Sequence, residues 1–222
     1  MGKLIHWPTF FITVLLTSLF MFVFIALRLK IGLDCSFEYK KLKKLKKKAK
    51  TGDLLVVAYG SKRAKLVKVF TGSMWTHCAV VVKLQNEIRV MEVAHYAKGE
   101  SGIILKSLDD WMEKNSNCLI GYRSYSGPPI SEKVVKTFIY KNCDIQVDLN
   151  VVSWLKSMYK VKYSKENKAK KYCSEFIVSF LQDSNLLAKK YKPAGYKPWE
   201  LLYGNLPMKS NHSYQDAVLL ED

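Results

Sequence analysis

The first pattern along the chain is a long run without charge. No Asp, Glu, Lys or Arg occurs between Lys3 and Arg28, and residues 7–27 are predominantly apolar. As a helix rising about 1.5 Å per residue, this run has the length of a bilayer's hydrocarbon core. A cleaved signal peptide has a shorter apolar core that ends in small residues, so residues 1–30 are predicted to form an uncleaved transmembrane anchor.

Apolar positions after residue 50 follow the short periods of strands. Leu54–Tyr59 and Leu119–Ser124 are apolar segments bounded by turn residues, and Glu87–Val93 alternates between apolar and polar positions. Cys78–Leu84 is apolar without alternation, which favours a strand buried on both faces. A turn is predicted at Gly99–Gly102, where small residues follow the last of these strands.

Helical spacing takes over in the second half of the chain. A short helix is predicted after a cap at Ser107, followed by longer helices over residues 131–140, 150–159 and 172–187. Residues 206–222 are polar and are predicted to form a loose tail. Strands followed by helices indicate an α+β domain with an antiparallel sheet packed on helices, and we place it at residues 51–205.

Basic side chains concentrate next to the apolar run. Residues 28–50 carry ten basic and two acidic side chains, so this segment supplies +8 of the net charge of +17. Because positive charge stays on the cytoplasmic side of a membrane, we expect the N-terminus across the membrane and the domain in the cytosol. Residues 31–50 are interpreted as a basic juxtamembrane linker with a short helix, either simply solvated or bound to anionic headgroups. The sequence has no zinc-finger spacing and no RNP-like aromatic motif, which disfavours nucleic-acid binding.

The cysteines constrain the compartment and the metal chemistry. Their number is five and they form no CxxC motif, which favours free thiols in a reducing compartment. His77 and Cys78 are adjacent and would point to opposite faces of a strand, and no other His/Cys cluster has ligand spacing. We therefore predict neither a metal nor a cofactor.

A histidine and a cysteine form a candidate catalytic pair. His77 opens the buried strand, whereas Cys173 lies at the start of a predicted helix, just behind Lys168, Lys170 and Lys171. A helix N-terminus and nearby cations both stabilise a thiolate, which is the nucleophilic form of cysteine. The alternative interpretation makes His77 a turn residue and Cys173 an inert core thiol.

Four short motifs give the domain a family resemblance. Gly52-Asp53 precedes the first strand, Thr76–Val82 contains the histidine, Val90–Ala94 follows, and Tyr172–Phe176 begins the helix with the cysteine. In this order, the motifs resemble those of the circularly permuted NlpC/P60 proteins, a papain-like superfamily. YiiX-like, poxvirus G6-like and lecithin:retinol acyltransferase-related proteins belong to this group.

The resemblance implies a role for each residue of the site. It makes Cys173 the nucleophile, His77 the general base and Glu92 the polar residue that orients the imidazole ring. His95 is the rival for the third role if the strand register differs. The backbone N–H of Cys173 at the helix start would contribute to an oxyanion hole. The N-terminal anchor departs from the bacterial relatives and argues against cell-wall peptides as the substrate.

The sequence therefore predicts a membrane-anchored cysteine hydrolase or acyltransferase that acts on amide or ester bonds of lipids, acylated proteins or peptides. Membrane lipids are the expected partners, because the anchor and the basic linker would hold the site near the cytosolic leaflet of a viral or host membrane. The alternative is a catalytically silent, membrane-associated scaffold or binding protein. The bond cleaved, the acceptor and the oligomeric state do not follow from the sequence.

Overall fold

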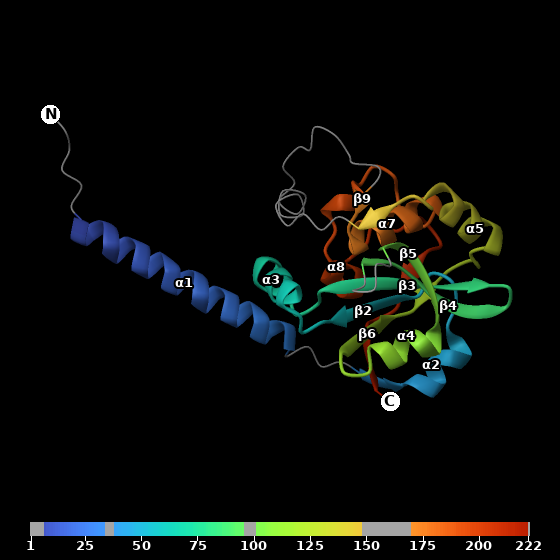
Figure 1. Ribbon diagram of the computed structural model, residues 1–222, viewed down its shortest axis with the longest axis horizontal. Helices are drawn as coiled ribbons and strands as arrows, with labels where there is room; N and C mark the ends of the chain where they lie inside the picture. Colours follow the sequence, from blue (N-terminus) through green and yellow to red (C-terminus); the bar gives the residue numbers. More distant parts are fainter. Residues whose placement is uncertain (1–6, 34–37, 96–100, 148–169, 222) are drawn as a thin grey trace.

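The computed structural model describes residues 7–33, 38–95, 101–147 and 170–221 (Figure 1). Its α-helices fall on both sides of one large sheet, and a short 3₁₀ helix covers Pro193–Gly195. The α-helices are α1 (Trp7–Leu33), α2 (Leu42–Lys48), α3 (Lys62–Thr71), α4 (Leu108–Lys114), α5 (Glu132–Lys141), α7 (Cys173–Asp183) and α8 (Pro198–Tyr203).

Seven strands form the central sheet in the order β1-β11-β6-β2-β3-β4-β5. All neighbours pair antiparallel except β1 and β11, which run parallel. Two-stranded ladders join β7 to β10 and β8 to β9. The strands are β1 (Glu38–Lys41), β2 (Leu54–Ala58), β3 (His77–Leu84), β4 (Glu87–His95), β5 (Ser101–Ser107), β6 (Leu119–Arg123), β7 (Tyr125–Ser126), β8 (Gln146–Val147), β9 (Lys170–Lys171), β10 (Ser213–Tyr214) and β11 (Val218–Glu221).

The sheet separates two hydrophobic cores because successive strand residues point to opposite faces. Val56 and Val80 join the core that contains the buried side chains of α7, whereas Val57 and Val81 join the core beneath α4. Helices α5, α7 and α8 cover the first face, and α4 and α2 lie on the second (Figure 1). The prediction of an α+β domain with an antiparallel sheet and helices is thus confirmed, with one parallel pair at the sheet edge.

Helix α7 shows how the apolar pattern sets the packing. Phe176, Ile177, Phe180 and Leu181 are fully buried and lie against β3 and β4. The predicted helix extended to residue 187, but α7 ends at Asp183. The chain turns there so that the next apolar residues enter the core as a loop.

Three other predicted segments are corrected by the structure. The turn predicted at residues 99–102 is replaced in part by β5, which pairs along the whole second half of β4. The loose tail predicted for residues 206–222 instead contains β10 and β11, because Val218 and Leu219 are buried against β6. The linker at residues 31–50 contains β1, which pairs with β11, and the short basic helix α2. The helix predicted over residues 150–159 lies outside the described residues.

The N-terminal apolar run forms the single long helix α1. Its described side chains, residues 11–24, are all exposed, including large apolar ones such as Phe20 and Phe22. Within the described part of the chain, no helix combines the length and hydropathy needed to cross a membrane.

One buried carboxylate ties the start of β2 to the strands beside it. Asp53 is fully buried, and its Oδ2 accepts hydrogen bonds from the Tyr122 hydroxyl at 2.7 Å and from the Lys50 N–H at 2.9 Å. Its Oδ1 accepts from the Tyr125 N–H at 2.8 Å. Burial raises the pKa of Asp53, and these donors oppose the rise. The Gly52-Asp53 motif therefore has a structural function at this position.

Replacing Asp53 with Ala should destabilise the domain strongly. Two buried donors and the partly buried Lys50 N–H would lose their acceptor, which we expect to lower the free energy of unfolding by about 3 kcal/mol or more. Chemical denaturation followed by circular dichroism measures the change. The control is Asp109→Ala, since Asp109 forms an exposed ion pair with Lys46 and should cost about 1 kcal/mol or less. Equal losses for the two variants would contradict the assigned function of Asp53.

Candidate active site

The candidate site lies where β3 and β4 stop pairing with each other. Their ladder runs from Leu84↔Glu87 to Val80↔Met91. Beyond that point β3 continues along β2, whereas β4 continues along β5 as far as its last residue. The start of β3 is therefore bonded on one side only, and side chains from several elements meet there.

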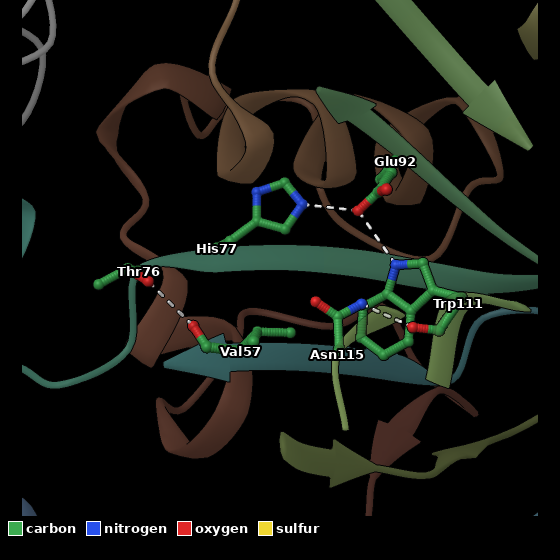
Figure 2. A network of polar contacts seen from close by, with 6 residues as sticks. All are labelled: Val57, Thr76, His77, Glu92, Trp111 and Asn115. Carbon is green, nitrogen blue, oxygen red and sulfur yellow. Dashed lines mark hydrogen bonds and ion pairs between the residues drawn. The ribbon is translucent and has the colours of Figure 1, made fainter. Parts of the chain in front are cut away.

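His77 and Glu92 bridge the two strands at this point. His77 Nε2 lies 2.7 Å from Glu92 Oε2, and the same oxygen accepts a 3.1 Å hydrogen bond from Trp111 Nε1 on α4 (Figure 2). The Glu92 side chain is 1% exposed. A carboxylate at this depth needs donors or a cation, and His77 and Trp111 provide them. With Nε2 directed at Glu92, Nδ1 lies on the opposite side of the ring.

Cys173 approaches the same point from the other core. It is the first residue of α7, whose N-cap Tyr172 makes no capping hydrogen bond with its side chain. The Cys173 sulfur interacts with the His77 ring, and it accepts hydrogen bonds from both the thiol and the backbone N–H of Cys78. The structure therefore brings together the three residues Cys173, His77 and Glu92.

The charges at the site favour an ion pair between sulfur and imidazole. Hydrogen bonding from Cys78, together with the charge and hydrogen bond of His77, holds the pKa of Cys173 well below its usual value despite burial. Burial alone would lower the pKa of His77, but the Cys173 thiolate and Glu92 outweigh it and raise the pKa to about 10. These shifts favour a thiolate beside an imidazolium, which is the reactive form of a thiol nucleophile.

Among the described residues, the groups that lower the pKa of Cys173 belong to Cys78 and His77. Lys171 donates a 2.9 Å hydrogen bond to Ser179 within α7. Lys168 lies outside the described residues. The expectation that neighbouring lysines stabilise the thiolate stays a prediction, and β3 supplies a contribution that it did not include.

His95, the rival for the third role, lies in a different environment. It is the last residue of β4, is exposed, and pairs with Ser101 of β5. Glu92 is instead buried and in direct contact with the His77 ring. The geometry favours Glu92, while the catalytic roles of all these residues remain predictions.

Three residues at the site were missed by sequence reasoning. Trp111 holds Glu92, Cys78 donates to Cys173, and the Tyr59 ring lies 5.5 Å from the His77 ring. The sequence places Cys78 at the start of the buried strand but assigns it no role beside Cys173. Its position after His77 was the available signal, because it faces the core on which α7 packs. Nothing in the local sequence marks Trp111 or Tyr59 as a site residue. Their proximity to His77 and Glu92 depends on how α4 packs on the sheet and on the pairing of β2 with β3.

The described residues contain no group of three or more His, Cys, Asp or Glu side chains arranged to hold a metal ion. The four described cysteines, Cys78, Cys118, Cys143 and Cys173, are free thiols.

The ion pair predicts an unusual pH dependence for alkylation of Cys173. Because its pKa is lowered, its rate with iodoacetamide should stay nearly constant from about pH 6 to about pH 9, whereas an ordinary thiol of pKa about 8.5 slows about tenfold per pH unit below that value. Mass spectrometry of the modified peptide measures the rate. The urea-unfolded chain is the control and should show the ordinary profile. A folded profile that matches the unfolded one would show that Cys173 is not activated.

The contact between Glu92 and His77 predicts the titration of the imidazole. Glu92→Gln removes a charge that favours the imidazolium, so the pKa of His77 should fall by about one unit or more. Nitrogen chemical shifts of the ring in a pH series measure it by NMR. The matched control is His95→Gln, which should leave the His77 titration unchanged. A larger effect of the control than of Glu92→Gln would assign the third role to His95.

Comparisons with known proteins add little to this geometry. No family model matches the chain, and a search of curated proteins found no match. Among solved structures, the fold is similar to one described as metalloprotein yiiX from Escherichia coli O157:H7. That similarity has 14% identity and a TM-score of 0.47, and covers 75% of this chain and 96% of the other. A likeness at this level says nothing of activity, and membership of the NlpC/P60 superfamily stays a prediction.

Proposed function

We propose that this protein is a cysteine hydrolase or acyltransferase of the NlpC/P60 type that acts on amide or ester bonds. Cys173 is the nucleophile, His77 exchanges protons with the substrate, and Glu92 orients the ring of His77. The single observation that carries the proposal is the network in which one imidazole contacts both Cys173 at a helix N-terminus and a buried carboxylate.

In the first half of the reaction, the Cys173 thiolate attacks the carbonyl carbon of the substrate and forms a tetrahedral oxyanion. The first backbone N–H groups of an α-helix have no partner within the helix, so those of α7 would stabilise this negative charge. The His77 imidazolium then gives its proton to the leaving amine or alcohol as the carbonyl re-forms. The product is a thioester between Cys173 and the acyl group, together with neutral His77.

In the second half, neutral His77 takes a proton from the acceptor, which attacks the thioester carbonyl. Collapse of this second intermediate expels the Cys173 thiolate and restores the imidazolium beside it. Glu92 stabilises the ring whenever it is charged and keeps it directed between the strands. Water as acceptor gives hydrolysis, and an amine or alcohol gives acyl transfer.

The proposed place of this reaction is a membrane surface. Helix α1 presents apolar side chains to its surroundings along its described length, and a basic segment follows it. These features support anchoring through residues 1–30, with the N-terminus across the membrane and the domain in the cytosol. Lipids or acylated proteins are then the preferred substrates, and peptides come second.

A substrate screen with matched variants tests the proposal. The full chain is required, because β1 pairs with β11 and Leu45 of α2 is buried. Fluorogenic lipid esters, acylated peptides and plain peptides should include one class that is turned over by the wild type. Cys173→Ala and His77→Gln should each reduce that turnover by about 10³-fold or more, since neither variant can form the ion pair.

The control for this screen is Cys143→Ala, because Cys143 is an exposed free thiol and should keep wild-type turnover. Circular dichroism of each variant checks that the fold is retained. Turnover by wild type and His77→Gln at the same rate would refute the proposed pair. A wild type that turns over none of the three classes, although its Cys173 is activated, would instead favour the silent scaffold.

A further inference from the structure

Helix α3 carries an apolar patch that the fold leaves uncovered. Of its ten residues only Ala64 is buried, and Leu66, Val69 and Phe70 are 48%, 48% and 41% exposed. Among the side chains beyond α1 whose exposure the structure describes, the other large exposed hydrophobic residues are tyrosines, which carry a hydroxyl. The helix therefore does not derive its position from burying its apolar side chains.

The three apolar residues form one stripe on the exposed face. Spacings of three and four residues place Leu66, Val69 and Phe70 on the same side of the helix, opposite Ala64. Lys62 lies within this face one turn earlier, and Lys65 and Arg63 lie on its two flanks. An apolar centre with a basic rim is the arrangement of helices that lie in the interface of a membrane.

The charge around the patch has a single sign. No Asp or Glu occurs between Asp53 and Glu87, so every charged side chain of α3 and of the segments next to it in the sequence is basic. A basic rim repels a basic surface and attracts anionic headgroups, while the apolar centre suits the acyl chains beneath them. The charge complementarity thus favours an anionic lipid surface over a protein partner with an ordinary mixture of charges.

Helix α3 is attached directly to the candidate active site. On its N-terminal side, α3 follows Tyr59 after two residues, and the Tyr59 ring lies 5.5 Å from the ring of His77. On its C-terminal side, residues 72–75 connect α3 to Thr76, which precedes His77. The two sides are fastened together, because the Tyr59 N–H donates to Thr76 Oγ1 at 2.9 Å and Thr76 donates to the Val57 carbonyl (Figure 2). In Figure 1, α3 stands beside the ends of β2 and β3, apart from the helices that cover the sheet.

We propose that the exposed face of α3 docks onto an anionic lipid surface and thereby presents the Cys173–His77 site to substrates held in that surface. The docking face is Leu66, Val69 and Phe70, with Lys62, Arg63 and Lys65 at its border. Only the second part, the substrate in the lipid, rests on the proposed function. The docking itself stands on the exposure, spacing and charge of α3.

Quenching of a tryptophan placed in the patch tests the docking. Full-chain Phe70→Trp is reconstituted into vesicles of acyl-chain-brominated phosphatidylcholine, with or without phosphatidylserine, and its emission is compared with that of the parent protein. With phosphatidylserine, the added tryptophan should lose about half of its fluorescence, because its ring would lie among the brominated acyl chains. Pure phosphatidylcholine should quench it much less.

Two controls separate docking from simple proximity to the vesicle. Tyr140→Trp places the probe on α5 at a residue that is 82% exposed, and its emission should be the same with and without bromine. Adding Lys62→Gln and Lys65→Gln to Phe70→Trp should remove the effect of phosphatidylserine, since the basic border is weakened. Phe70→Trp quenched no more than Tyr140→Trp, or quenched equally by both vesicle types, would overturn the inference.

Activity then distinguishes this inference from the proposed function. Phe70→Ser and Leu66→Ser should lower turnover of a vesicle-bound lipid ester about tenfold while leaving a short-chain soluble ester unaffected, because neither residue contacts the reacting groups. Quenching without turnover of any substrate would refute the enzyme and leave the docking intact. Turnover of vesicle lipid by a protein whose Phe70→Trp variant is not quenched would refute the docking alone.

Discussion

The arrangement of the site depends on one buried negative charge. Glu92 is almost completely removed from solvent, and a carboxylate in such a place is stable only with donors or a cation around it. Trp111 supplies a neutral donor and His77 supplies the cation. Because His77 is held in its charged form, the thiol of Cys173 beside it loses its proton more easily. The burial of Glu92 therefore influences the pKa of both His77 and Cys173.

Side chains from the two cores come together at the beginning of β3. His77 and Cys78 are consecutive, so their side chains leave the strand on opposite faces. His77 turns toward Glu92 and Trp111 of one core, whereas Cys78 belongs to the core that supports α7. Both nevertheless interact with Cys173, because β3 has lost its pairing with β4 there and the start of α7 lies against the unpaired segment. A fully paired strand would have kept these faces apart.

The local pattern of apolar residues predicted the strands around the site, but it did not predict the residues that hydrogen-bond to Glu92 and Cys173. The segments now seen as β2, β3 and β4 were readable because their apolar positions and bounding turns are local properties of the sequence. Strand β1 is the segment Glu-Tyr-Lys-Lys, and its strand conformation depends on pairing with residues far along the chain. Helix α3 was missed because its apolar side chains face outward. The hydrogen bond from Trp111 could not be predicted, since it depends on how α4 packs on the sheet.

The parallel pairing of β1 with β11 has a mechanical consequence for the chain as a whole. It fastens the segment that follows α1 to the edge of the sheet, and Leu33 and Glu38 are only five peptide steps apart in the sequence. Five steps reach at most about 18 Å even when fully extended. If α1 is embedded as proposed, the edge strand β1 keeps the domain within this distance of the end of α1. The domain therefore stays close to the membrane, and only the faces near β1 can contact the surface that α1 enters.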